Sequence, residues 1–284
     1  MRIGIVTDST TDRTPEEYKQ IDVTMVPLVV RFGDEVKRDW IDVEPAEFYK
    51  RMRSSNILPQ TSQPSVQDFV DAYHALAKDY DHIISIHLTS KLSGTVHSAE
   101  AAAVMVKDEI PVTVIDSEVI SLLLWVVVKR IDAARRAGKS LDEILNMIDD
   151  SKRRAKLFFS VDTMKYLEKG GRIGKAQAFL GQLLSIKPIL TLTDGGIPTP
   201  KAKGKGTKSA IRDMVAFAQE EIEKLPVGEP PALVMAHADC LDTLAYMEHL
   251  VDVAGLPYSE KLTGWIGAVV GSHLGPGTLA IGII

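Results

Sequence analysis

The sequence predicts an α/β protein of two domains, the first built on a doubly wound, mainly parallel sheet and the second on a mixed sheet. In the first half of the chain, short β-branched runs alternate with helical stretches, which is typical of parallel sheets with helical connections. Near residue 155 this alternation gives way to two apolar runs around the turn Asp194-Gly195-Gly196, which predict a hairpin. The length of 284 residues is about twice the common domain size. We therefore expect domains at residues 1–155 and 156–284.

In the first domain, β-branched runs predict strands at residues 3–6, 25–32, 82–88 and 112–115. Helical patterns are expected at residues 15–20, 45–53, 66–79, 95–107 and 118–137. Two segments, Thr14-Pro15-Glu16-Glu17 and Ser140-Leu141-Asp142-Glu143, each place a capping hydroxyl three residues before a glutamate, and the second begins a helix through residue 150. Ligands of parallel sheets gather at the carboxyl ends of the strands, so functional residues are expected there.

In the second domain, strands are expected at residues 157–161, 188–193, 197–200, 232–236 and 278–284. A short helix is expected before the glycine pair Gly170-Gly171, and longer helices at residues 175–184, 207–224 and 241–254. This mixture of a hairpin with isolated strands and helices indicates a mixed sheet.

One segment, residues 119–128, is apolar nearly all round. Ile120, Leu123 and Val127 recur on one helical face, while Leu122 fills another. Such a helix is most often sandwiched between layers of a core, but it could also line an apolar ligand tunnel, and both interpretations stay open here. Ten residues are about half a membrane span, so we expect no transmembrane helix.

Composition and charge exclude several classes of function. The chain has 33 lysines and arginines against 38 aspartates and glutamates, a net charge of −5, whereas nucleic-acid binding draws on a clustered basic excess. The single cysteine, Cys240, excludes an internal disulfide and a cysteine-based zinc site, and it favours a reducing cytoplasm. The histidines share no metal-ligand spacing. We therefore expect a cytoplasmic protein without a metal, a cofactor or a nucleic-acid partner.

Two hydroxyl-rich segments are candidates for anion binding. Thr61-Ser62-Gln63-Pro64-Ser65 offers three hydroxyls and an amide, although Ser65 with Asp68 also has the spacing of a capping box. Ser90-Lys91-Leu92-Ser93-Gly94-Thr95 follows an expected strand and begins a helix, where free N–H groups and the helix dipole favour a carboxylate or phosphate. The alternative is that Ser93 only caps this helix.

Two glycine-rich loops carry further candidates. Gly170-Gly171-Arg172-Ile173-Gly174-Lys175 lacks the first glycine and the Ser/Thr of a phosphate-binding loop, so it predicts no nucleotide site. Its Arg172 suits bidentate recognition of an anion, and the alternative is a plain turn with a solvated arginine. His273 falls in a turn-rich loop before the last expected strand, where it is a candidate acid, base or anion contact. The Gly-x-Ser-x-Gly pattern of a hydrolase is missing, so we assign no catalytic residue.

Together these segments resemble the DegV family of bacterial fatty-acid-binding proteins, which includes the acyl-binding subunits of fatty acid kinase. The resemblance covers nearly the whole chain. Besides the segments above, it is carried by Ile5-Val6-Thr7-Asp8-Ser9, by Val114-Ile115-Asp116-Ser117 and by residues 166–177 and 271–282. Five motifs in the order of the family are more specific than any one of them.

The resemblance implies two α/β domains that bury one long acyl chain, such as hexadecanoate, between or beside them. It implies that Thr61 and Ser93 hold the carboxylate, with Arg172 and His273 near this head group. The neighbouring residues that would lie near the head group or face a partner are Ser62, Gly94 and Thr95. In family members that serve fatty acid kinase, a separate ATP-binding subunit phosphorylates the bound fatty acid, so the family protein is a carrier and not the catalyst.

One departure from the family concerns chain length. Family members often have a Ser-x-Gly-x-Gly pattern after the strand that ends in Asp-Ser, whereas here Ser121 is followed by Leu122-Leu123-Leu124-Trp125. If this helix lines the tunnel, the bulk of Leu123 and Trp125 would shorten or bend it. We therefore expect selectivity to shift toward shorter, bent or unsaturated chains.

Two other functions stay open from the sequence. An enzyme that uses Ser93, Arg172 and His273 on an acyl or phosphate ester would need a nucleophile with its base and an orienting group, a pattern that the sequence lacks. A regulatory protein that senses a lipid and binds another protein would have the same site residues as a carrier.

Overall fold

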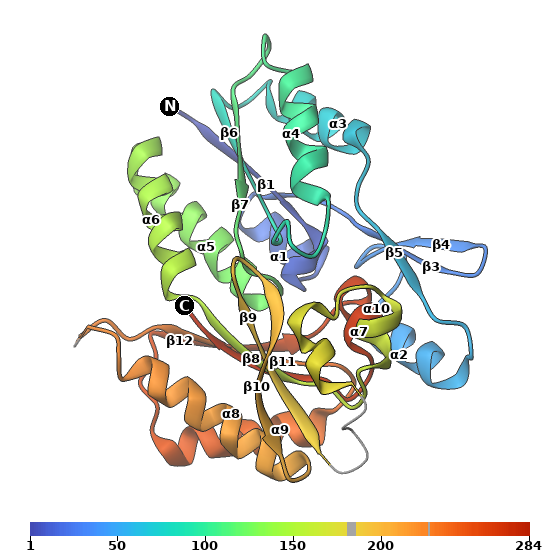
Figure 1. Ribbon diagram of the computed structural model, residues 1–284. Coiled ribbons are helices and arrows are strands. Elements are labelled where there is room, and N and C mark those ends of the chain that lie inside the picture. The colour runs from blue at the N-terminus through green and yellow to red at the C-terminus, as the bar shows by residue number, and fades with distance from the viewer. Residues whose placement is uncertain (181–185, 227) are drawn as a thin grey trace.

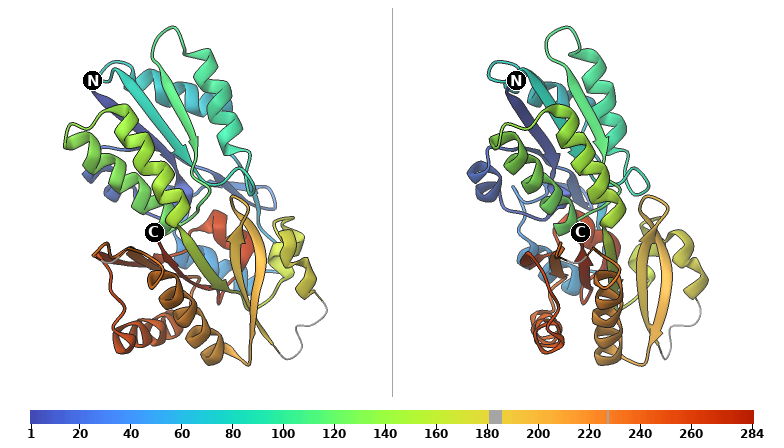
Figure 2. Two further views of the ribbon diagram at one scale, coloured as in Figure 1. Left: turned by 60° about the vertical axis from the view of Figure 1, so that its left-hand side comes forward. Right: turned by 90° about the vertical axis from the view of Figure 1, so that its left-hand side faces the viewer.

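The computed structural model describes residues 1–180, 186–226 and 228–284, and its strands form three sheets (Figure 1). The sheet of the first half and its helices lie on one side of the molecule (Figure 2). The sheet of the second half lies on the other side with α8 (Thr207–Ile222) and α9 (Leu241–Ala254). Among the described residues, no helix combines the length and the apolar character needed to cross a membrane.

The first half forms a parallel sheet of four strands in the order β2-β1-β6-β7. These strands are β1 (Ile3–Asp8), β2 (Thr24–Val26), β6 (His82–His87) and β7 (Val112–Asp116). The helices around them are α3 (Val66–Leu76), α4 (Thr95–Met105), α5 (Leu122–Arg136) and α6 (Leu141–Arg154). Successive residues of a strand face opposite sides, so Ile5 and Ile84 join the apolar cluster of α5, whereas Val6 and Ile83 join that of α3 and α4. Helices on both faces confirm the predicted doubly wound sheet.

The helix starts that the sequence marks do form. Thr14 and Ser140 accept hydrogen bonds from the N–H groups of the glutamates three residues later, at the starts of α1 (Pro15–Gln20) and α6. Ser65 forms the same kind of capping box with Asp68 at the start of α3. The capping interpretation of Ser65 is therefore confirmed.

The strand predicted at residues 25–32 is instead two strands in two different sheets. β2 ends at Val26 and β3 (Val29–Phe32) belongs to a small antiparallel sheet of order β4-β3-β5. Pro27 separates the two strands and has no N–H to offer a sheet, so the chain leaves the parallel sheet there. The partners of β3, which the sequence did not reveal, are β4 (Glu35–Arg38) and β5 (Gln60–Ser62).

The helix predicted at residues 118–137 begins later, at Leu122. Glu118 and Ser121 both have a φ of 60°, in the left-handed region, which a right-handed helix cannot include. The backbone N–H of Ser121 donates instead to the carbonyl oxygen of Thr10, 2.8 Å away. The segment 118–121 is therefore a tight connection that ties α5 to the end of β1.

The second half forms a mixed sheet of six strands in the order β10-β9-β8-β13-β11-β12, in which β11 and β12 are parallel and the other neighbours antiparallel. The strands are β8 (Lys156–Ser160), β9 (Lys187–Thr193), β10 (Ile197–Gly204), β11 (Ala232–His237), β12 (Glu260–Trp265) and β13 (Leu279–Ile283). One face carries Phe158 and Leu233, which pack under α8 and α9, and the other carries Phe159 and Val234, which face α5. The mixed sheet is confirmed, and β12 was not anticipated.

Several short helices complete the structure: η1 (Ser9–Thr11), α2 (Pro45–Ser54), α7 (Lys165–Lys169), η2 (Gly174–Phe179) and α10 (Ala268–Leu274). The helix predicted at residues 175–184 is a 3₁₀ helix over Gly174–Phe179, and residues 181–184 of that prediction lie outside the described residues. His273 lies in the last turn of α10 and not in a loop, which corrects the expectation. The boundary at residue 155 stays a prediction, since α10 also packs against α2, β3 and β5 of the first half.

Candidate functional site

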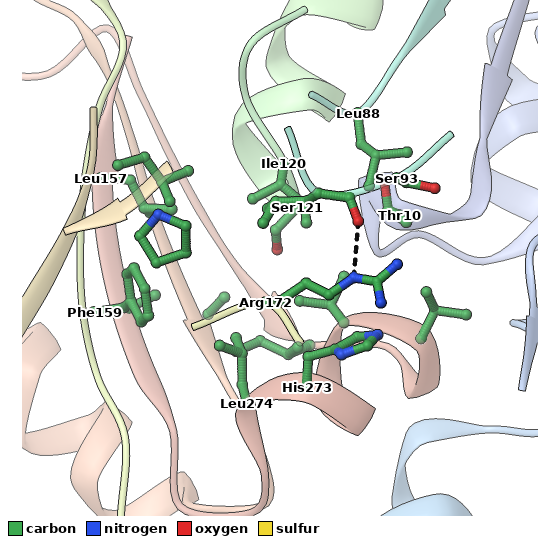
Figure 3. A pocket seen from close by; sticks show the side chains of 18 of the residues that line it. Thr10, Leu88, Ser93, Ile120, Ser121, Leu157, Phe159, Arg172, His273 and Leu274 are labelled. Atoms are coloured by element: carbon green, nitrogen blue, oxygen red, sulfur yellow. Dashed lines mark hydrogen bonds between the residues drawn. The ribbon is translucent and has the colours of Figure 1, made fainter. Parts of the chain in front are cut away.

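A cavity of about 340 Å³ lies between the carboxyl ends of the parallel strands and the inner face of the mixed sheet (Figure 3). Its volume is within the range of small-molecule sites, about 300–1,000 Å³. Thr10 follows β1 and Leu88 follows β6, so the parallel sheet presents its carboxyl edge to the cavity, as ligand-binding sheets do.

The mixed sheet supplies the apolar wall of this cavity. Leu157 and Phe159 of β8 and Val234 and Ala236 of β11 are alternate residues of their strands, so they share one face and line the cavity. The other apolar lining residues are Leu28, Leu88, Leu92, Ile120, Leu122, Leu123, Leu167, Leu192, Pro198, Ile266, Val269, Val270, Leu274 and Ala280. An apolar interior of this kind suits a hydrocarbon chain.

Polar side chains gather on the side of the cavity away from Leu157 and Phe159, as Figure 3 shows for Thr10, Ser93 and Arg172. The polar lining residues are Thr10, Thr61, Ser62, Gln63, Ser93, Ser121, Arg172 and His273. The cavity is therefore amphiphilic, with hydrogen-bonding groups at one end and hydrocarbon at the other.

Thr61 and His273 meet at this polar end from opposite halves of the chain. Thr61 lies on β5, held opposite Val30 of β3, and its Oγ1 is 2.8 Å from the Nε2 of His273. The imidazole ring rests on Gly170, where a Cβ would lie only 2.2 Å from Nδ1, so this position has no room for a side chain. The Nδ1 atom of His273 is buried without a hydrogen-bond partner among the described residues.

The imidazole of His273 is neutral at physiological pH. Burial, and to a smaller extent the positive charge of Arg172, lowers its pKa from the ordinary value of 6.5 to about 4. When Nε2 carries the proton, it donates to Thr61 Oγ1 and leaves the hydroxyl hydrogen of Thr61 free for another acceptor.

Arg172 brings a positive charge to the same end of the cavity. Its Nε donates to the carbonyl oxygen of Leu92 at 3.0 Å, and its Nη1 to that of Gly170 at 2.9 Å. In the part of the chain that the structure describes, no carboxylate lies within ion-pair distance of this guanidinium. The arginine is thus not a solvated turn residue, and its charge is available to an anion in the cavity.

Ser93 lines the cavity just before α4. The N-cap of this helix is Gly94, and the Oγ of Ser93 accepts from the backbone N–H of Thr95 at 3.3 Å and lies 2.9 Å from its Oγ1. Ser93 therefore does not occupy the capping position, although it satisfies one N–H of the first turn. Gly94 and Thr95 are expected near the head group. Neither residue lines the cavity, so they lie behind Ser93.

Gln63 fastens the two hydroxyl-rich segments together. Its Nε2 donates to the carbonyl oxygen of Gly94 at 3.1 Å and to the hydroxyl of Ser98 at 2.8 Å. A Cβ at Gly94 would lie 2.1 Å from Gln63 Oε1, so glycine is needed for this approach. Thr61, Ser62 and Ser93 consequently line one end of a single cavity.

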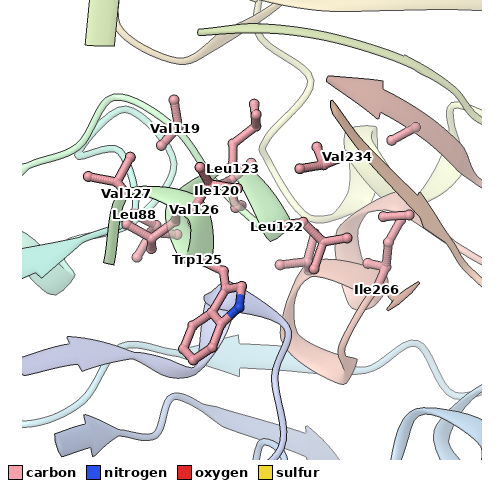
Figure 4. Packing of buried hydrophobic residues seen from close by; sticks show 14 of the residues in the cluster. Leu88, Val119, Ile120, Leu122, Leu123, Trp125, Val126, Val127, Val234 and Ile266 are labelled. Atoms are coloured by element: carbon pink, nitrogen blue, oxygen red, sulfur yellow. The ribbon is translucent and has the colours of Figure 1, made fainter. Parts of the chain in front are cut away.

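Leu123 lines the cavity, but Trp125 does not. Residues two apart on a helix are about 200° apart around its axis, and Figure 4 shows these side chains pointing to opposite sides of α5. The ring of Trp125 packs edge-on against Tyr18, 5.4 Å between centroids, within the core. The expectation that Trp125 forms part of the wall is corrected: one face of this helix lines the cavity, and another packs into the core.

Two buried aspartates that the sequence did not single out organise the polar end. Asp12 accepts from the hydroxyl of Ser121 and from the N–H of Gly267, and Asp39 accepts from the N–H of Ala268 at 3.0 Å. These bonds fix the start of α10, which carries His273. Burial raises the pKa of Asp12 to about 7 and that of Asp39 to about 8, and at Asp39 the charge of Asp12 adds to the rise. Thr10 and Ser121, which the sequence did not single out as site residues either, also line the cavity.

A second polar network resembles a catalytic triad but lies away from the cavity. Asp8 is 3.1 Å from Nδ1 of His87, whose Nε2 is 2.7 Å from the hydroxyl of Ser85. All three side chains are fully buried and none lines the cavity, so a substrate cannot reach this serine. Asp8 also accepts from the N–H and hydroxyl of Thr10, so it positions a residue that does line the cavity.

The side chains at the polar end are of the kinds that suit recognition of an anion. Ser93 shares its hydroxyl with Thr95 and has no histidine beside it in the described part of the chain. Thr61 is bonded to Nε2 of His273, but Nδ1 of this ring has no partner among the described residues, so no group orients the imidazole as a catalytic base. Among the described residues, no three His, Cys, Asp or Glu side chains are placed to share a metal ion. Hydroxyl donors beside an unneutralised guanidinium suit a carboxylate or a phosphate.

Comparisons of the sequence and of the structure with known proteins point to one family. A family model described as an uncharacterised protein of the DegV family matches residues 2–284. Protein DegV of Bacillus subtilis is 36% identical over 282 residues, which cover 99% of this chain and 98% of that protein. A fatty-acid-binding DegV family protein of Thermus thermophilus superposes with a TM-score of 0.92 at 36% identity and covers 100% of this chain and 99% of its own.

A second solved structure, the fatty-acid-binding protein DegV of Bacillus subtilis, superposes with a TM-score of 0.89, and the match covers 100% of this chain and 99% of that one. The similarity thus spans both halves of the chain, in sequence as in structure. This chain belongs to the DegV family.

Proposed function

We propose that this protein binds a long-chain fatty acid such as hexadecanoate, with its carboxylate near Thr61 and Ser93 and its acyl chain in the apolar part of the cavity. The observation that carries the proposal is the amphiphilic lining of one cavity, in which the charge of Arg172 meets no carboxylate among the described residues. A fatty acid has the complementary structure, with one negative head group and a long hydrocarbon chain.

The arrangement of donors supports this orientation of the ligand. Thr61 can donate its hydroxyl to a carboxylate while it accepts from Nε2 of His273. Ser93 lies at the start of α4, where the helix dipole adds favourable charge for an anion. Ser62 lines the same end, with Gly94 and Thr95 behind it.

Relatives support the same ligand class. The structurally similar proteins of Thermus thermophilus and Bacillus subtilis are described as fatty acid binding, and they are each 36% identical to this chain. Binding of fatty acids by DegV proteins therefore makes the fatty acid the first ligand to test here.

The proposal extends to a role as a cytoplasmic carrier. The protein would present the carboxylate to a separate ATP-binding fatty acid kinase subunit, which would phosphorylate it, and the carrier itself would not be the catalyst. What supports this is the polar end, where Arg172 and His273 would stand beside the head group and where, among the described residues, no group orients the imidazole of His273 as a base. In the kinase reaction these two residues would serve the carboxylate and the partner subunit.

Mass spectrometry of the purified protein tests the proposal. Protein purified from bacterial cells without detergent should carry fatty acid at about one molecule per chain, detected in native spectra and identified after extraction. Delipidated protein should recover that mass on addition of hexadecanoate. Repeated purification of ligand-free protein that takes up no fatty acid would contradict the proposal.

A further inference from the structure

We infer that Leu123, Leu157 and Leu192 form a floor at the apolar end of the cavity and set the longest acyl chain that the protein accommodates. This inference rests on the proposed function, because it concerns the chain of the same bound fatty acid. It assigns chain-length selection to three residues from three different elements.

A second cavity on the far side of these leucines is the starting observation. It has a volume of about 360 Å³, and the residues that line both cavities are Leu123, Leu157 and Leu192. The cavity described above is called the first cavity from here on. Where one layer of side chains lines two cavities, that layer is the partition between them.

The three leucines come together from α5, β8 and β9. The register pairs Phe158 of β8 with Thr191 of β9, so Leu157 and Leu192 are cross-strand neighbours on the other face. Leu123 reaches the same sheet at Gly282 of β13, where a Cβ would lie 3.2 Å from its Cδ1. Figure 3 shows Leu157 on the side of the first cavity away from Ser93 and Arg172. The floor therefore lies where the methyl end of the ligand would arrive.

The second cavity differs from the first in its chemistry. Charged side chains line it, among them Glu118 and Lys152, which form an ion pair at 2.8 Å, and Lys156 and Asp194. Such a space is suited to water and not to hydrocarbon. A methylene group that passed the floor would gain little from burial, so the floor limits length even where a chain could pass between the leucines.

This arrangement predicts how affinity depends on chain length. Each added methylene that stays in the first cavity should tighten binding about fourfold, the equivalent of about 0.8 kcal/mol. The gain should stop at one chain length, the length at which the methyl end reaches the floor. Removing part of the floor should move this break to longer chains.

The test measures dissociation constants of delipidated protein for saturated fatty acids from about ten to twenty carbons. The variants Leu157→Ala and Leu192→Ala shorten the floor, and Leu167→Ala is the matched control, because Leu167 lines the first cavity only. Thermal unfolding of each variant comes first. Leu192 is only half-buried, so we expect Leu192→Ala to fold even if Leu157→Ala does not.

In the floor variants, the chain length at which the gain in affinity stops should increase by at least one methylene. In Leu167→Ala this length should not change, although binding should be weaker for acyl chains of all lengths. An unchanged break in both folded floor variants would overturn the inference, as would an equal shift in the control. These outcomes differ from failure of the proposed function, in which the parent protein binds no fatty acid of any length.

Discussion

Replacing Thr61 by valine removes one hydroxyl and little volume, so it isolates the head-group contact on which the proposed function depends. In the structure this hydroxyl is bonded to Nε2 of His273 at 2.8 Å and lines the polar end of the cavity. A hydrogen bond to a charged group contributes about 1.5–3 kcal/mol, so Thr61→Val should weaken fatty-acid binding about tenfold to a hundredfold.

The same substitution should also affect stability, and the two effects must be separated. With Nδ1 of His273 already unpaired, loss of the Thr61 hydroxyl leaves the ring without a partner, at a cost of about 1–3 kcal/mol in the free energy of unfolding. Thermal unfolding of ligand-free protein measures this cost. Thr61→Ser keeps the hydroxyl and should stay close to the parent protein in both properties.

The assay is displacement of a fluorescent fatty acid from delipidated protein, with hexadecanoate and the uncharged alcohol of the same chain length as competitors. The parent should prefer the acid, and Thr61→Val should lose affinity for the acid more than for the alcohol, since only the acid makes the charge-assisted bond. An equal loss for both competitors would mean that the effect arises from the fold. Unchanged affinity for the acid would refute the head-group assignment.

Three further predictions concern other parts of the site. Arg172→Ala and His273→Ala should still bind the lipid, with weaker affinity in Arg172→Ala because a charge beside the carboxylate is lost, but both should lose acyl-phosphate formation with the matching kinase, and full activity in both would remove them from the site. Burial raises the pKa of Asp39 to about 8, so its native state keeps a proton that the unfolded chain releases near pH 4. The free energy of unfolding should therefore decrease as pH rises from about 4 to about 8, and Asp39→Asn should flatten this decrease in chemical denaturation, with a residual slope up to about pH 7 from Asp12. Trp125→Ala should destabilise the protein by about 3–5 kcal/mol without changing the preferred chain length, and a changed length profile would restore Trp125 to the wall.

The fold was largely predictable because its signals are local. The two capping boxes at Thr14 and Ser140 and the alternation of strands and helices are read from neighbouring residues, and both survive in the structure. The sequence-based predictions fail where contacts between residues far apart in the sequence determine the local structure. β5 has three residues and exists through pairing with β3, and α10 lies between the glycine caps Gly267 and Gly275 yet is held at its start by Asp12 and Asp39, more than two hundred residues away.

The site shows the same division. Thr61, Ser93, Arg172 and His273 were identified from motifs, and the structure places all four along one cavity. Trp125 is expected in the wall together with Leu123, but two residues along a helix turn a side chain by about 200°, so Trp125 points to the opposite side of α5. The partition between the two cavities had no sequence signal, because its three leucines come together only through the packing of α5 on the mixed sheet.

A crystal structure of the delipidated protein soaked with hexadecanoate tests the central claim most directly. The account predicts a carboxylate oxygen at about 2.6–3.0 Å from Oγ1 of Thr61 and a second contact to Ser93, with the chain directed toward Leu157 and Phe159. A carboxylate bound among the lysines of the second cavity, or a chain that runs with its methyl end against Arg172, would contradict it.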